Sequence, residues 1–194
     1  MNYKILPAMD NFLASSIKQF HYYKSLGDQT FDQLLDEQLF WQFNESSNSI
    51  ALIVKHLSGN ILSRWTDFLT ADGEKAGRNR DMEFENTWST RAELIAHWNK
   101  GWSCLFEALD SLSEEDLQRI IYIRNQGHTV MEAILRQLAH YPYHIGQIVY
   151  IGKMCMDQKW SSLSIPKGKS AVYNQAKFDQ TKKKQHFTDE FLKK

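Results

Sequence analysis

Apolar residues recur at three- and four-residue intervals in four long stretches of the chain, which is the spacing of amphipathic helices. The clearest stripe consists of Ile50, Ile53, Val54, Leu57, Ile61 and Phe68. We therefore expect helices over residues 7–26, from the polar cluster at 46–49 to 70, over 89–109 and over 129–156. The last of these is apolar on nearly every side, so we expect it to be a buried central helix.

Residues at the ends of these stretches support the helix boundaries. Pro7 occupies a first-turn position that proline tolerates, and Gly27 follows the first helix, where glycine commonly ends one. The polar cluster at 46–49 offers capping side chains to the second helix. Thr90 and Glu93 form the capping-box pattern at the start of the third helix.

The remaining segments read as connections. We expect a connection over 28–48 with a short helical turn near 31–38, a polar loop over 71–87, a helical turn over 111–119, a β-like stretch over 120–124 and a tail over 157–194. Long helices joined by loops predict an all-α fold, a four-helix bundle with a C-terminal extension. The domain then covers residues 1–175 and the tail covers 176–194.

Composition excludes several classes of protein. The 194 residues contain 23 Lys and Arg against 23 Asp and Glu, so the chain lacks the basic surplus of a nucleic-acid-binding protein. Every window of about 20 residues carries charge, so we expect no transmembrane helix. The two cysteines, Cys104 and Cys155, show no metal-ligand spacing and suit a reducing compartment. We expect a cytoplasmic protein without a nucleic-acid or membrane partner.

Two histidines in the fourth helix are candidate metal ligands. His140 and His144 are four residues apart, which places both imidazoles on one helix face, as in helical zinc sites. Such pairs also arise by chance, so packed structural histidines are the alternative. Pro142 between them predicts a kink that the helix either tolerates or uses to aim the rings.

A third histidine strengthens the hypothesis of a metal site. His56 lies midway along the second helix on a partly polar face. Three imidazoles from two helices would leave metal positions open for water or substrate, as in catalytic sites. We interpret His97, beside tryptophans in the third helix, as a packed or surface residue.

Longer motifs resemble a known family. SNSIALIVKHLSGN in the second helix and RQLAHYPYHIGQIVYIGK in the fourth resemble the DinB-like superfamily, over about residues 5–175. The resemblance implies a four-helix bundle whose three-histidine metal site corresponds to His56, His140 and His144. NILSRWTDFLTADGEKAGRNRD and WSSLSIPKGKS are similar to a bacterial branch of unknown function. Relatives include thiol S-transferases that use bacillithiol or mycothiol and a mycothiol-dependent isomerase, and the family is often labelled as metal-dependent hydrolases.

The residues near the expected ligands suggest further roles. Asn60 and Gln147 lie on the ligand-bearing faces, where they could hydrogen-bond an imidazole or a bound water. Arg136 and Arg64 could bind an anionic group of a substrate, although salt bridges are the commoner use of arginine. Zinc and nickel suit neutral imidazoles, with iron or copper as alternatives.

The leading functional hypothesis is a metal-dependent enzyme that acts on a small-molecule substrate. It would be either a low-molecular-weight thiol S-transferase, with the thiol as cofactor, or a hydrolase. The alternatives are a non-catalytic metal-binding module and a stress-response module that dimerises. We also expect a homodimer, because the chain has more aromatic residues than one small core normally buries: Trp65, Trp88, Trp98, Trp102 and Phe106.

Overall fold

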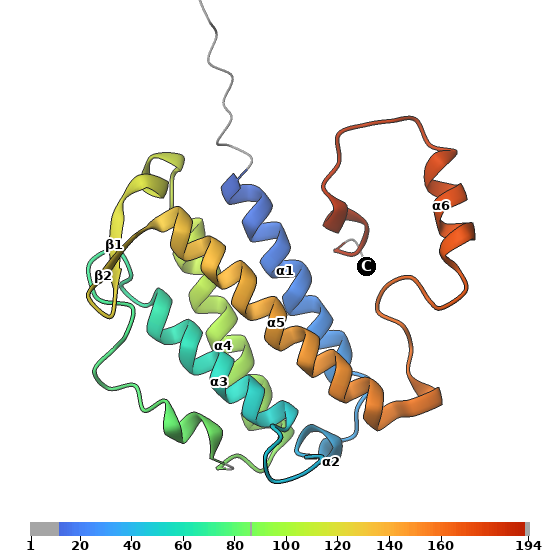
Figure 1. Ribbon diagram of the computed structural model, residues 1–194, viewed down its shortest axis with the longest axis horizontal. Helices are drawn as coiled ribbons and strands as arrows, with labels where there is room; N and C mark the ends of the chain where they lie inside the picture. The colour runs from blue at the N-terminus through green and yellow to red at the C-terminus, as the bar shows by residue number, and fades with distance from the viewer. Residues whose placement is uncertain (1–11, 86, 193–194) are drawn as a thin grey trace, which may run out of the picture.

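Four long helices lie side by side in the computed structural model, which describes residues 12–85 and 87–192 (Figure 1). They are α1 (Phe12–Phe31), α3 (Ile50–Trp65), α4 (Arg91–Asp110) and α5 (Val130–Met156). The shorter elements of the described residues are α2 (Asp36–Leu39), α6 (Ser170–Phe178), the 3₁₀ turns η1 (Asp81–Phe84), η2 (Glu114–Gln118), η3 (Asp157–Lys159) and η4 (Phe187–Glu190), and the strands β1 (Ile120–Ile123) and β2 (Gln126–Thr129). The fold is therefore mostly helical, as expected.

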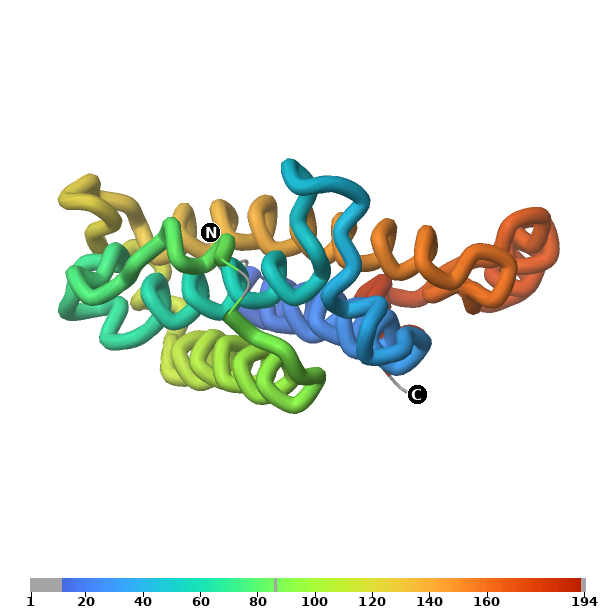
Figure 2. Tube along the Cα trace, turned by 90° about the horizontal axis from the view of Figure 1, so that it is seen from below, coloured from blue at the N-terminus to red at the C-terminus, as the bar shows by residue number. Residues whose placement is uncertain are grey.

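The directions of the long helices determine which connections must be long. Helices α1 and α5 run one way and α3 and α4 run the other (Figure 1). Helix α3 packs against α4 and α5, and α1 packs against α5 and α4. Because α3 and α4 are parallel neighbours, the chain must run back along the length of α3 before α4 can begin (Figure 2). This return segment, residues 66–90, packs against α3 through η1.

The apolar stripes of the helices meet in one core. In α3 nearly every residue is buried, including Ile50, Leu57 and Ile61 of the predicted stripe. Full burial of one such side chain contributes about 1.5–3 kcal/mol. An aromatic cluster fills the centre, where the Trp102 ring lies 5.3 Å from Trp98 and 6.0 Å from Tyr141 between ring centroids.

Three of the aromatic residues that suggested a dimer are core residues. Trp65, Trp98 and Trp102 are each at most 3% exposed within a single chain. The aromatic content is therefore largely accommodated by the chain's own core and gives little support for an interface.

Capping side chains explain where the long helices begin. The Ser49 hydroxyl accepts the backbone N–H of Leu52, which confirms the start expected from the polar cluster at 46–49. Thr90 and Glu93 form the predicted capping box of α4. Thr129 forms the same motif with Glu132 at the start of α5. Each cap satisfies backbone N–H groups that lack a partner within the helix.

The predicted end of the first helix is wrong. Helix α1 continues through Gly27 to Phe31, and the expected start at Pro7 lies outside the described residues. Gly27 is buried, and a Cβ atom there would lie 2.6 Å from the Trp98 ring. The glycine is thus explained by the close approach of α4 and not by a helix end.

Two further helix predictions need correction. Helix α3 ends at Trp65 and not at residue 70, because the backbone turns at Asp67, where φ is 48°. Helix α5 is not buried all round, since it packs on its neighbours through one face only. Its other side exposes large apolar residues to solvent, namely Leu135, Tyr143, Tyr150 and Met154.

The strands and the tail complete the fold. Strands β1 and β2 form an antiparallel hairpin, which confirms the β-like stretch expected over 120–124. In the tail, η4 packs against α1, where Lys18 Nζ lies 2.7 Å from Asp189 Oδ1. The expected domain boundary at residue 175 falls inside α6. Among the described residues, none of the helices has the length and apolar character needed to cross a membrane.

Candidate metal centre

Three histidines from two helices converge at one point. His56 comes from α3, and His140 and His144 come from the neighbouring, oppositely directed α5. One nitrogen of each ring lies within 4.8 Å of the others, and the Nε2 atoms of His140 and His144 are 3.0 Å apart. Two nitrogens bound to one tetrahedral zinc ion at 2.0–2.1 Å would be about 3.3 Å apart. The group could therefore hold a metal ion.

The Nδ1 atom of each imidazole forms a hydrogen bond with a side-chain oxygen. His56 Nδ1 lies 2.9 Å from Glu83 Oε2, His140 Nδ1 3.3 Å from Gln137 Oε1, and His144 Nδ1 2.8 Å from Gln147 Oε1. With the proton on Nδ1, each neutral ring presents the lone pair of Nε2. Metal-binding histidines in proteins are oriented in this way.

Burial keeps the imidazoles of α5 neutral. Desolvation, reinforced by the neighbouring His144 and His56, lowers the pKa of His140 to about 4. Desolvation also lowers the pKa of His144, although its hydrogen bond with Gln147 opposes the shift. Only neutral imidazole binds a metal, so near neutral pH these rings need not lose a proton first.

Glu83 is the buried carboxylate that orients His56. Burial alone would raise the pKa of Glu83, but hydrogen bonds from His56 and Arg78 outweigh it and lower the pKa. Arg78 donates from Nε to Oε1 at 2.7 Å and from Nη2 to Oε2 at 2.9 Å. Gly59 on α3 makes room for this carboxylate, and the Phe84 ring stacks on His56. Carboxylate and imidazole therefore form a fixed pair.

A buried hydrogen-bond chain fixes Asn60. Trp65 Nε1 donates to the Tyr141 hydroxyl at 3.1 Å, and that hydroxyl donates to Asn60 Oδ1 at 3.3 Å. All three residues are buried. Because the Asn60 oxygen accepts this hydrogen bond, the orientation of the amide is fixed. Its NH₂ group is then a donor on the wall of the cavity described next.

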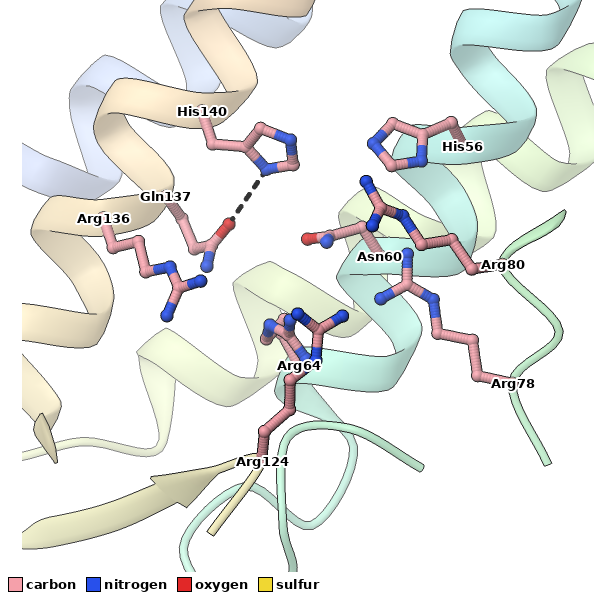
Figure 3. A pocket seen from close by; sticks show the side chains of 9 residues that line it. All are labelled: His56, Asn60, Arg64, Arg78, Arg80, Arg124, Arg136, Gln137 and His140. Carbon is pink, nitrogen blue, oxygen red and sulfur yellow. Dashed lines mark hydrogen bonds between the residues drawn. The ribbon is translucent and has the colours of Figure 1, made fainter. Parts of the chain in front are cut away.

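A cavity of about 220 Å³ adjoins the histidines (Figure 3). It is lined by His56, Asn60, Arg64, Arg78, Arg80, Arg124, Arg136, Gln137 and His140. Of the residues expected near the ligands, Asn60, Arg64 and Arg136 lie in this lining, whereas Gln147 contacts His144. Arg64, for which we expected either an anionic group or a surface salt bridge, forms a salt bridge with Glu74 but is only 6% exposed.

The other histidines of the chain lie outside the cluster. His97 is exposed and stacks on Trp88, in agreement with its interpretation as a packed or surface residue. His21 stacks on Phe106 at 3.8 Å between ring centroids. His186 Nε2 lies 2.9 Å from the Ser15 hydroxyl and links the tail to α1.

Sequence reasoning missed Glu83, Arg78, Arg80 and Arg124. The first three lie in residues 71–87, which we expected only to form a polar loop. Helical periodicity could not reveal them, because the segment is not helical apart from η1. The available signal was the density of charge in GRNRDMEFE, which is unusual for a simple connection.

The fold and this site define a mostly helical protein with a three-histidine group that could hold a metal ion. The chain belongs to the family described as "protein of unknown function (DUF1572)", which matches residues 8–169. No match was found among curated proteins or among solved structures.

Proposed function

We propose that this chain is a metal-dependent enzyme with a four-helix bundle of the DinB-like type. The observation that carries the proposal is the arrangement of the three imidazoles. Each has Nδ1 bound to a glutamate or glutamine oxygen, and two of them border a cavity. Zinc or nickel suits this donor set best, and iron or copper also binds imidazole.

The cavity favours catalysis over storage of the metal. Structural zinc sites have four protein ligands, whereas catalytic sites have three and keep a position for water or substrate. A bound divalent cation supplies Lewis acidity, which lowers the pKa of a water molecule or thiol and gives a nucleophile near neutral pH. Either hydrolysis or transfer of a low-molecular-weight thiol would follow from this chemistry.

The residues of the chain have separate tasks in this proposal. Glu83, Gln137 and Gln147 hold the three rings in position. The amide of Asn60 offers a hydrogen bond to a molecule in the cavity, and the Tyr141 hydroxyl keeps that amide oriented. Substitution of such supporting residues typically lowers metal affinity or activity 10–100-fold.

Metal analysis tests the proposal directly. Untagged protein should contain about one equivalent of a divalent metal, and His140→Ala should lose it. His97→Ala is the matched control, because His97 is an exposed histidine outside the cluster, and it should keep the metal. If the triple alanine variant of His56, His140 and His144 bound one equivalent with unchanged affinity, the assignment would be wrong.

A screen of activity separates the two reactions. Metal-loaded protein is assayed for conjugation of thiols to electrophiles and for hydrolysis of esters and amides, with His140→Ala as the blank. Full metal occupancy without any activity that His140→Ala abolishes would favour a non-catalytic metal-binding module.

The homodimer and the cytoplasmic location remain part of the proposal. Sedimentation velocity at micromolar concentration measures the first, and a single species near 22.8 kDa would contradict it.

A further inference from the structure

Five arginines from four separate segments line the cavity beside the histidines (Figure 3). Arg64 comes from α3, Arg78 and Arg80 from the return segment, Arg124 from the turn between β1 and β2, and Arg136 from α5. The chain as a whole has equal numbers of acidic and basic residues, so this concentration is local.

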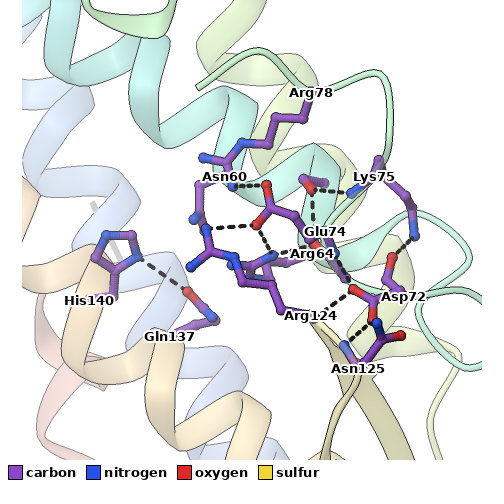
Figure 4. Close-up of polar contacts among 12 residues, drawn as sticks. Asn60, Arg64, Asp72, Glu74, Lys75, Arg78, Arg124, Asn125, Gln137 and His140 are labelled. Atoms are coloured by element: carbon purple, nitrogen blue, oxygen red, sulfur yellow. Dashed lines mark hydrogen bonds and ion pairs between the residues drawn. The ribbon is translucent and has the colours of Figure 1, made fainter. Parts of the chain in front are cut away.

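Carboxylates balance only part of this charge, and Figure 4 shows two of them, Glu74 and Asp72. Glu74 lies 3.1 Å from Arg64, 3.1 Å from Arg124 and 3.5 Å from Arg78, and Glu83 pairs with Arg78. With Asp72, whose charge also acts on Arg64, five positive charges thus face three negative ones.

Two of the arginines are free to bind a ligand. Within residues 12–85 and 87–192, the side chain of neither Arg80 nor Arg136 forms a hydrogen bond or an ion pair. Both are exposed, so turning their side chains toward a bound molecule costs little free energy. Arginine is well suited to this task because its guanidinium forms paired hydrogen bonds with phosphate and carboxylate groups.

Arg64 also retains an unused donor. Its side chain is only 6% exposed, and its Nε has no hydrogen-bond partner among the described residues. Its Nη1 donates to the Gly73 carbonyl and lies 3.1 Å from Glu74 Oε2. An unpaired buried donor costs about 1–3 kcal/mol, so the oxygens of the chain do not fully satisfy this guanidinium.

The turn that carries Arg124 has a defined backbone conformation, and hydrogen bonds hold it in place. Arg124 and Asn125 both have positive φ, at 56° and 59°, which is the pattern of a type I′ hairpin turn. The Asp72 carboxylate accepts both of their backbone N–H groups at 2.8 Å (Figure 4). The return segment and the hairpin are thereby joined at the edge of the cavity.

We propose that this arginine pocket binds a doubly charged oxyanion group, a phosphate or a pair of carboxylates, on the molecule that reacts at the histidine centre. The identification of that molecule as a substrate rests on the proposed function, whereas binding of the anion does not. His56 and His140 line the same cavity as the arginines, so the anionic group would hold the rest of the ligand beside the Nε2 atoms. The cavity of about 220 Å³ is smaller than the roughly 300–1,000 Å³ of pockets for drug-sized ligands, so it suits a small anionic group rather than a large molecule.

Calorimetric titration of the full-length protein with inorganic phosphate and with malonate tests the proposal. Both anions are titrated into the protein as purified and into protein freed of metal by a chelator. The metal-free arm excludes binding to the metal itself. At least one anion should bind at about one equivalent in both arms, with affinity falling as ionic strength rises. Tighter binding of phosphate or of malonate tells which kind of group the pocket takes.

The variants Arg80→Gln and Arg136→Gln should each weaken that binding about tenfold or more. Arg119→Gln is the matched control, because Arg119 is a half-exposed arginine outside the pocket, and it should bind the anion as the unmodified protein does. The proposal is wrong if neither anion binds, or if both pocket variants bind as tightly as the control. Metal content is measured in parallel, so the absence of anion binding by unmodified protein with normal metal content overturns this inference alone.

Discussion

Gly59 and Glu83 fit together so closely that a side chain on one excludes the present position of the other. A Cβ atom on Gly59 would overlap Glu83 Oε1 and lie 2.9 Å from its Cδ. Since Glu83 holds the Nδ1 atom of His56, a glycine on α3 controls the orientation of a histidine of the candidate metal centre one turn away.

Substitution of this glycine should therefore lower the affinity for the metal. We expect Gly59→Ala to displace the carboxylate and weaken metal binding about 10–100-fold, as Glu83→Gln should do directly. A competition assay with a chromophoric chelator measures the affinity. The combination of the two substitutions should be no worse than either alone, because both remove the same contact.

Gly146 on α5 provides the control for a glycine in a helix near the site. A Cβ atom there meets no heavy atom of the described residues within 4 Å. Gly146→Ala should stabilise the fold by about 0.4–1 kcal/mol, because it restricts the unfolded chain, and leave metal affinity unchanged. Equal effects of the two glycine substitutions on metal affinity would refute the explanation based on Glu83.

The hydroxyl of Tyr141 should contribute to stability. Tyr141→Phe leaves the Trp65 Nε1 donor and the Asn60 Oδ1 acceptor without their partner in a buried site. The free energy of unfolding should fall by about 1–3 kcal/mol, as measured by urea denaturation. An unchanged denaturation midpoint would show that this hydrogen-bond chain does not form.

Low pH should break the contact between Asp72 of the return segment and the hairpin of β1 and β2. Backbone N–H groups of Asn125, Glu74 and Arg124 bind the Asp72 carboxylate and hold its pKa below the ordinary value of about 4. A lowered pKa in the folded state means that the contribution of Asp72 to stability is complete above pH 4. That contribution is lost as the pH falls through the lowered value.

Amide resonances can follow this titration. The Arg124 and Asn125 amides should shift with a midpoint below pH 4, and Asp72→Asn should abolish that transition. A midpoint at or above the ordinary value would mean that the carboxylate does not accept these hydrogen bonds.

The parts of the site that the sequence could predict are those that depend on one helix at a time. His140 and His144 share a face because four residues make nearly one helical turn, whatever surrounds the helix. Gln147, one turn further on, contacts His144 for the same local reason. The approach of His56 required the packing of α3 against α5, which the apolar stripes and the resemblance to a known family together suggested.

The parts that could not be predicted depend on contacts between distant segments. Gly27 looked like a helix end because glycine serves both to end helices and to admit a neighbour, and only the position of Trp98 distinguishes these. The place of Glu83 depends on the ion pair with Arg78 and on the space beside Gly59. Neither contact can be recognised from the spacing of apolar residues along the sequence.

The parallel arrangement of α3 and α4 also divides the candidate site between packed helices and a long connection. The three histidines sit on packed helices, whereas the return segment, whose length is imposed by topology, carries both the buried Glu83 that contacts His56 and the exposed Arg80. Exposed positions of residues 66–90 such as Arg80 can therefore be changed while the contact between Glu83 and His56 is kept. Substitutions at such exposed positions of the segment are where a changed ligand preference would be engineered with the packed helices left intact.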